Sequence, residues 1–231
     1  MKIQELTLYT SNIEGQSEFY SQVLGLKIVK KSPKSISVQV GNTLLHFEFK
    51  KTATPYHFAI NIPANKAVEA LNWLKSRCSI LKDGQDEIID FRSWNAKAIY
   101  FYDLDLNIVE FIARINLKND SDKKFGPEQF LEISEIGVPT RDIENVFSIL
   151  SDVMEIEIYD GGFENFCAIG DETGLFICID RDHKKWYPTN DKAFASNFQL
   201  ALQEKGKQYH VEFNNEGIKV VGLNNPKTQK I

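Results

Sequence analysis

The chain repeats part of itself. The segment 5–14, Glu-Leu-Thr-Leu-Tyr-Thr-Ser-Asn-Ile-Glu, returns without a gap 130 residues later as the segment 135–144, Glu-Ile-Gly-Val-Pro-Thr-Arg-Asp-Ile-Glu. A unit of about 45 residues that occurs twice indicates a duplicated domain core, because solenoids need three or more repeats. The same offset aligns further residues: Val23 with Val153, Leu24 with Met154, Ile28 with Ile158, Thr43 with Thr173, Leu45 with Leu175, and Phe47 with Ile177.

The composition is that of a globular protein. The chain has 231 residues, of which 42% are hydrophobic and 26% are charged. Its net charge of -5 disfavours a nucleic-acid partner, because phosphate binding needs a basic face. No apolar run approaches the ~20 residues of a membrane span, and the N-terminus begins directly in a strand pattern. Because three cysteines without metal or redox spacing fit reduced thiols, we expect a cytoplasmic protein.

The first half of the chain reads as two βαβββ modules. Residues 3–9 alternate with period 2, which predicts a strand, and Asn12 and Gly25 bracket a helical pattern. Further strands are predicted near 26–31, 35–40 and 43–50. A second strand–helix pair follows at 56–62 and 65–78, with strands near 86–90, 97–102 and 107–115.

The second half repeats this order only in part. A strand at 131–138, a helix at 142–154 and strands near 155–160, 163–169 and 174–180 form a third module. The last three strands, near 198–203, 208–213 and 218–223, have no helix between them. We therefore predict an α+β fold of tandem βαβββ modules whose second half is degenerate and has lost one helix. The polar segment 116–128 is the predicted linker between a domain at 1–115 and a degenerate domain at 129–231.

Three segments resemble a known family. Segment 8–26 contains Leu-Tyr-Thr-Ser-Asn-Ile-Glu, then Phe-Tyr and Val-Leu-Gly-Leu; segment 57–60 is His-Phe-Ala-Ile; segment 101–111 is Phe-Tyr-Asp-Leu-Asp-Leu-Asn-Ile-Val-Glu-Phe. In this order they resemble the vicinal oxygen chelate superfamily of glyoxalases, bleomycin-resistance proteins and extradiol dioxygenases. The third segment has Leu104 and Leu106 where the family usually has proline and glycine, so we expect an altered turn. The resemblance covers residues 3–115 and, more weakly, 131–180. It implies that paired modules form a half-barrel cleft for metal and substrate.

The resemblance also implies a metal site. The family's ligands come from the first strand of each module and from the closing strand, and position by position these are Glu5, His57 and Glu110. One imidazole and two carboxylates would suit Mn²⁺, Fe²⁺, Zn²⁺ or Ni²⁺ and leave positions open for a substrate with adjacent oxygens. Leu45 fills the position of a possible fourth ligand, and His46 is expected on the opposite strand face. Glu5 and Glu110 are also the candidate catalytic bases.

The second copy offers less to a metal. Glu135 matches Glu5, but its closing strand carries Phe176 and Ile177, and the next module opens without a histidine in register. Gln199 is at most a weak oxygen ligand. We therefore expect one site, in the first half, and a non-catalytic second half. The candidate substrate-binding residues on the cleft strands are Tyr9, Asn61, Tyr100 and Tyr102, although each could equally serve packing.

Three functions fit these residues. The first is a metal-dependent enzyme with lyase or isomerase chemistry on a small oxygenated substrate. Ring-cleaving dioxygenation is less favoured, because such iron sites usually combine two histidines with one carboxylate. The second is a metal-free protein that sequesters a small hydrophobic or aromatic compound, and the third is a pseudo-enzyme. Because the duplication can pair modules within one chain, we expect a monomer or a homodimer.

Overall fold

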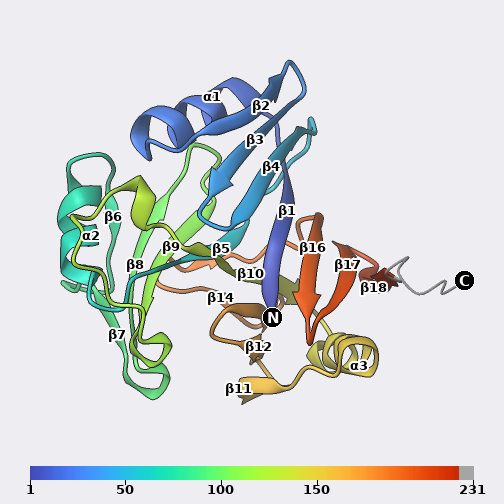
Figure 1. Cartoon of the computed structure of the whole chain (residues 1–231). Coiled ribbons are helices and arrows are strands. Elements are labelled where there is room, and N and C mark those ends of the chain that lie inside the picture. Colours follow the sequence, from blue (N-terminus) through green and yellow to red (C-terminus); the bar gives the residue numbers. More distant parts are fainter. Residues whose placement is uncertain (224–231) are drawn as a thin grey trace, which may run out of the picture.

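The computed structural model describes residues 1–223, and the described chain forms two large sheets with three α-helices (Figure 1). Asn12 caps the first helix, because its Oδ1 accepts a hydrogen bond of 2.9 Å from Gly15 N. The first module consists of β1 (Lys2–Thr10), α1 (Ile13–Glu18), a π-helical turn η1 (Phe19–Val23), β2 (Ile28–Ser32), β3 (Ser35–Val40) and β4 (Thr43–Phe49). The second consists of β5 (His57–Ile62), α2 (Ala67–Lys75), β6 (Ile80–Leu81), β7 (Ile89–Phe91), β8 (Ala96–Tyr102) and β9 (Ile108–Arg114).

The later modules follow the predicted order. The third consists of β10 (Glu132–Thr140), α3 (Ile143–Met154), β11 (Ile158–Gly162), β12 (Phe166–Asp171) and β13 (Gly174–Asp180). A small two-stranded sheet, β14 (Lys185–Trp186) and β15 (Asp191–Lys192), then leads to β16 (Phe198–Glu204), β17 (Lys207–Asn214) and β18 (Gly217–Leu223). The predicted α+β fold of βαβββ modules is confirmed, and so is the missing fourth helix.

The modules pair in a nested order. In the nine-stranded sheet, β5 of the second module runs antiparallel to β10 of the third. In the seven-stranded sheet, β1 of the first module runs antiparallel to β16 of the fourth, so the N-terminal strand lies beside β16 (Figure 1). The predicted linker 116–128 lies between β9 and β10, which belong to the same sheet. It therefore does not separate the two sheets; residues 224–231 of the predicted second domain lie outside the described residues.

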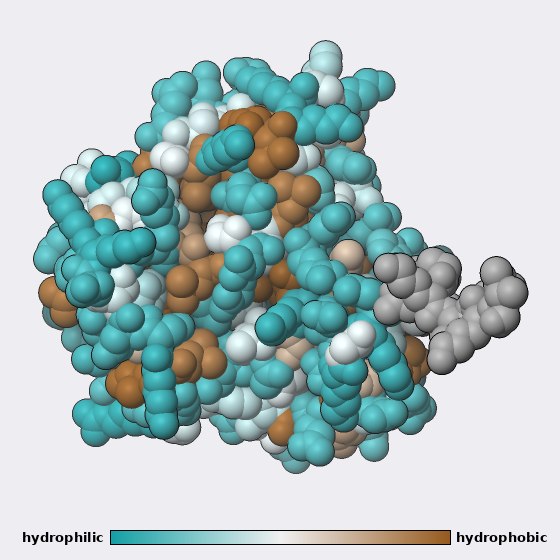
Figure 2. Space-filling model, viewed as in Figure 1, coloured by the Kyte–Doolittle hydropathy of each residue, from teal (hydrophilic) through white to brown (hydrophobic). Residues whose placement is uncertain are grey.

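The two sheets pack against each other over one core. Leu6 and Leu8 of β1 lie in the same buried cluster as Phe58 and Ile60 of β5 and Ile136 of β10. Since side chains alternate along a strand, the neighbours of these residues point away from the core on the outer face of each sheet. Buried hydrophobic side chains of all three helices join this core. The face of the molecule seen in Figure 2 is mainly hydrophilic with smaller hydrophobic patches.

The turn that precedes β9 keeps its hydrogen bonds despite its unusual residues. Asp103 Oδ1 accepts bonds of 3.0 Å from the backbone N of both Asp105 and Asn107. Leu106 has a φ of 60°, a left-handed conformation that suits the family's glycine better than a leucine. Leu106 therefore holds a strained conformation in a turn that Asp103 stabilises by hydrogen bonds.

None of the helices in the described part of the chain combines the length and the hydrophobicity of a membrane span. All three cysteines are free thiols, and Cys167 and Cys178 are fully buried.

Candidate metal centre

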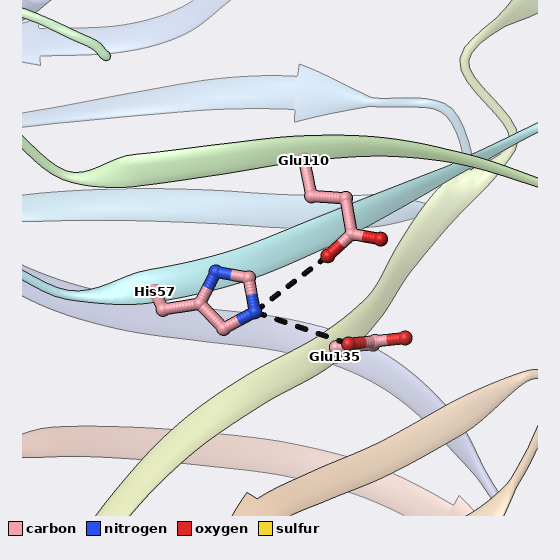
Figure 3. Close-up of side chains that lie close together, drawn as sticks. All are labelled: His57, Glu110 and Glu135. Carbon is pink, nitrogen blue, oxygen red and sulfur yellow. Dashed lines mark ion pairs between the residues drawn. The ribbon is translucent and has the colours of Figure 1, made fainter. Parts of the chain in front are cut away.

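Three buried side chains converge on the outer face of the nine-stranded sheet (Figure 3). His57 comes from β5, Glu110 from β9 and Glu135 from β10. Glu110 and Glu135 both lie opposite Ala59, one from each neighbouring strand, and Ala59 shares a face with His57. The register thus brings the two carboxylates to either side of a small residue. His57 Nε2 lies 3.6 Å from Glu110 Oε2 and 4.0 Å from Glu135 Oε2.

The imidazole of His57 has the tautomer and charge of a metal ligand. Its Nδ1 donates a hydrogen bond of 3.1 Å to the carbonyl oxygen of Ile108, so the lone pair on Nε2 faces the two carboxylates. Burial lowers the pKa of His57 to about 4, which leaves the ring neutral at physiological pH. Neutral imidazole is the form that binds metal ions.

The pKa values of both carboxyl groups, Glu110 and Glu135, are raised. Burial and then the negative charge of Glu135 raise the pKa of Glu110 well above its ordinary value. Burial also raises the pKa of Glu135, and the guanidinium of Arg114 opposes that rise by donating from Nη2 to Glu135 Oε1. A divalent cation between the carboxylate oxygens and Nε2 would remove this repulsion. In residues 1–223, this is the only set of three acidic, histidine or cysteine side chains that close together, and its donor set fits such an ion.

The cluster opens into an aromatic cavity of about 330 Å³. Tyr100 lies beside Glu110 in the lining, and burial followed by the charges of Glu110 and Glu135 keeps the pKa of the phenol well above its usual range. The walls are mainly apolar, so a ligand there would contact rings and leave the carboxylates as the main polar groups. The cavity is lined by His57, Phe91, Trp94, Tyr100, Glu110, Glu135, Phe166, Ile177, Ile179, Lys184, Lys185, Trp186 and Tyr187.

The segment around β14 and β15 covers one side of the cavity. The indole of Trp186 lies 4.9 Å from the imidazole of His57, measured between ring centroids. Gly137 of β10 makes room for it, since a Cβ there would come within 2.7 Å of two indole carbons. Tyr102 anchors β15 by donating from its hydroxyl to Asp191 Oδ2 at 2.5 Å. The third module and the segment after it therefore supply both a candidate ligand and a wall.

Comparison with known proteins supports the resemblance seen in the sequence. No protein-family profile matches the chain. The metallothiol transferase FosB of Staphylococcus haemolyticus is 32% identical over 110 residues, a match that covers 45% of this chain and 76% of FosB. The chain belongs to the vicinal oxygen chelate superfamily.

Solved structures show the same fold at lower identity. A Bacillus subtilis protein, provisionally assigned as a dioxygenase, superposes with a TM-score of 0.65 at 12% identity, covering 98% of this chain and 86% of its own. A mutant glyoxalase I from Zea mays gives a TM-score of 0.57 at 12% identity, covering 96% of this chain and 93% of that one. At such identities the likeness concerns the fold alone, and in both cases it extends over nearly the whole chain.

In this vicinal oxygen chelate protein, Glu5 is not beside His57 and Glu110, which corrects the expected ligand set. Glu5 lies on β1 in the other sheet, its side chain is 57% exposed, and its Oε2 is 3.6 Å from His46 Nε2. The reason is the nested pairing: β5 lies against β10 and not against β1. Glu135, the counterpart of Glu5 in the repeat, takes the place beside His57.

The prediction that Leu45, and not His46, lies on the same face of the sheet as Glu5 is also wrong. His46 lies opposite Thr7 on β1, and Thr7 shares a face with Glu5, whereas Leu45 is buried in the core. In register, Glu5 and His46 correspond to His57 and Glu110. Gln199 lies opposite Thr7 as Glu135 lies opposite Ala59. The first and fourth modules thus form an exposed counterpart of the centre, with a glutamine in place of one carboxylate.

The four candidate substrate-binding residues have different surroundings. Tyr100 lines the cavity. Asn61 lies deeper, accepting from Arg114 Nε at 3.2 Å and donating to Glu132 Oε1 at 2.8 Å. Tyr102 anchors β15, and Tyr9 lies on the outer face of the other sheet, with Lys50 Nζ 5.1 Å from its ring centroid.

Sequence reasoning missed Glu135 and Arg114. Glu135 has no ligand partner within the second half of the chain, and its partners His57 and Glu110 come from the first half. The second half of the chain thus contributes one side chain, Glu135, to the cluster. The burial of Arg114 could not be predicted from the sequence, because a single arginine at the end of a strand is ordinarily exposed.

Proposed function

We propose that this protein is a metal-dependent enzyme of the vicinal oxygen chelate superfamily, with one divalent ion held by His57, Glu110 and Glu135. The observation that supports this most is the convergence of three buried ligand atoms within 4.8 Å of one another at the base of a cavity. Burying two carboxylates and an imidazole together is costly unless a cation compensates. Chemistry of the lyase, isomerase or group-transfer type on a small oxygenated substrate fits the site best.

A bound ion with three protein ligands would act as a Lewis acid on a substrate oxygen at its open positions. The protein's own residues would supply the rest. Glu110, whose pKa burial raises well above its ordinary value, is the candidate group for taking up and returning a proton, and Tyr100 lies beside it in the cavity. The rings of Trp94, Phe166 and Trp186 would hold the substrate and exclude water from the reacting atoms.

The FosB relative is named a metallothiol transferase, and that name supports group transfer among the possible reactions. The cavity of this chain is walled by aromatic rings and has a volume of about 330 Å³, enough for a small ligand with an apolar body. We therefore propose a substrate with an apolar body, and a monomer as the active form, since the modules already pair within one chain.

Metal analysis of matched variants tests the proposal. We expect about one Mn²⁺, Fe²⁺, Zn²⁺ or Ni²⁺ per wild-type chain, and loss of the metal in Glu135→Gln and in His57→Ala. Glu5→Gln is the matched control, because it makes the same change at the repeat-equivalent position and should bind metal like the wild type. Metal loss in Glu5→Gln with retention in Glu135→Gln would overturn this ligand set.

A metal-free binding protein is the second candidate. It is favoured by the Arg114–Glu135 ion pair and the raised pKa of Glu110, which together can leave the cluster near neutrality without a metal. The aromatic cavity would then sequester a small compound. A wild-type protein that takes up none of the four ions, with Fe²⁺ tested anaerobically, would support this function against the enzyme.

A further inference from the structure

Arg114 is a fully buried cation beside the candidate centre. It lies on the same face of β9 as Glu110. Its Nη2 donates to Glu135 and its Nε to Asn61, while Nη1 has no hydrogen-bond partner among the described residues. The indole of Trp94, a cavity wall, lies 5.5 Å from the guanidinium carbon.

Arg114 also determines how Glu135 is presented. Its bond engages Oε1, so the other oxygen, Oε2, is the one that faces Nε2 of His57. Glu135 would therefore offer Oε2 to an ion as the oxygen that Arg114 does not engage.

The charges around the cavity have a positive excess. With a divalent ion bound, the two carboxylates cancel its two charges and the guanidinium charge is left over. Without an ion, Arg114 still balances Glu135. Arg114 does not itself line the cavity, but it contacts two residues that do, Glu135 and Trp94. Besides Glu110 and Glu135, the charged residues of the lining are the cations Lys184 and Lys185, and Lys184 Nζ lies 4.9 Å from the ring centroid of Phe166.

Carboxylates close to the rim do not reverse this balance. Asp160 accepts a hydrogen bond from Trp94 Nε1 and Asp83 accepts one from Tyr187, but neither lines the cavity. Both bonds are exposed to solvent, and so are Lys184 and Lys185, so the charges of all four residues are strongly screened. A buried guanidinium in a low-dielectric surrounding acts on a ligand far more strongly.

We propose that the cavity takes its ligand as an anion with a flat, apolar body, and that Arg114 is the positioning residue that sets this preference. The aromatic walls provide the stacking surface for the body. The inference deepens the proposed function by naming a substrate class. In the metal-free protein Arg114 contributes by neutralising Glu135, and Lys184 and Lys185 are then the positive charges left at the cavity. The protein as a whole is acidic, with a net charge of -5, so a cavity that prefers anions would differ in charge from the rest of the molecule.

The test compares two probes of the same shape. Salicylate carries one negative charge and two adjacent oxygens, and salicylamide is its neutral counterpart. Calorimetric titration of each into metal-loaded and chelator-treated wild type should show about tenfold or stronger preference for salicylate. In Arg114→Met the preference should fall to about threefold or less, whereas Arg114→Lys, which keeps the charge, should restore most of it. Arg141→Met removes an exposed guanidinium paired with Asp182 and serves as the matched control, with the preference unchanged.

The outcomes separate the two proposals. A wild type that binds no metal but still prefers salicylate, with the preference lost in Arg114→Met, supports this inference while the proposed enzyme fails. Metal binding that depends on Glu135, together with equal affinity for both probes, refutes the inference and leaves the metal site standing. If Arg114→Met does not fold, as judged by circular dichroism, the wild-type ratio and Arg114→Lys decide: equal affinities for the two probes in either protein contradict the proposal.

Discussion

Replacing Gly137 by alanine should destabilise the protein through a single identifiable clash. The new Cβ would lie 2.7 Å from both Cζ2 and Cη2 of Trp186 and 3.2 Å from the carbonyl oxygen of His57. Unstrained carbon atoms approach to about 3.5–4.0 Å, so the indole would have to withdraw by roughly 1 Å. Trp186 is only 6% exposed, and moving it would separate it from His57. Overpacking of this kind costs about 1–3 kcal/mol.

A double-mutant cycle isolates that clash. Urea unfolding followed by circular dichroism gives the free energy of unfolding of wild type, Gly137→Ala, Trp186→Ala and the double variant. Removing the indole itself should cost about 3–5 kcal/mol, but alanine at position 137 should then be neutral or stabilising by up to about 1 kcal/mol. Gly162→Ala is the control, since a Cβ there meets no atom within 4 Å. An equal cost of Gly137→Ala with and without the indole would refute the reasoning.

Three further predictions concern the turn and the centre. Leu106→Gly should stabilise the fold by roughly 0.5–1 kcal/mol in urea unfolding, because a 59% exposed leucine leaves a left-handed conformation, while Leu104→Gly, also exposed but at ordinary φ, should not; equal effects would contradict this. As the pH falls from 6.5 to about 4, the free energy of unfolding of the metal-free wild type should drop by up to about 3 kcal/mol more than that of His57→Gln. The lowered pKa of His57 is the reason, because in that pH range the folded state binds fewer protons than the unfolded state. Parallel pH profiles of the two proteins would exclude a buried neutral histidine. Metal binding should release protons from Glu110, whose pKa is raised, and the release should grow as the pH is lowered; calorimetry in buffers of different ionisation enthalpy measures it. No proton release at any pH would contradict a raised pKa for Glu110.

The order of strands and helices follows from the sequence because it depends on local patterns. The alternation in β1, the cap at Asn12 and the helical spacing in α3 each involve neighbouring residues, and β1, α1 and α3 each begin within a few residues of the predicted start. The short strands β6, β14 and β15 were not predicted. The pairing of the modules is different. It depends on which strands meet across more than a hundred residues of chain, and both Glu5 and Glu135 fit the same repeat position.

One local property does separate the two glutamates. Polar residues alternate through β1, so one of its faces can meet solvent, whereas β5 and most of β10 are buried on both faces. Two strands that are buried on both faces lie together in the interior of the sheet. That contrast favours His57 with Glu135, but the buried charge of Arg114 has no comparable sequence pattern.

The nested pairing has a consequence for the order in which the protein is made. The strands that hold His57, Glu110 and Glu135 lie within residues 57–180, a continuous stretch that can pair its modules as soon as it leaves the ribosome. The first module emerges earlier, yet the antiparallel partner of β1 is β16, which is synthesised near the end. Until then β1 has an open edge and its share of the core is incompletely covered, a state prone to aggregation. A chain cut short before β16 would therefore keep every candidate ligand and still lack the strands that close its first module.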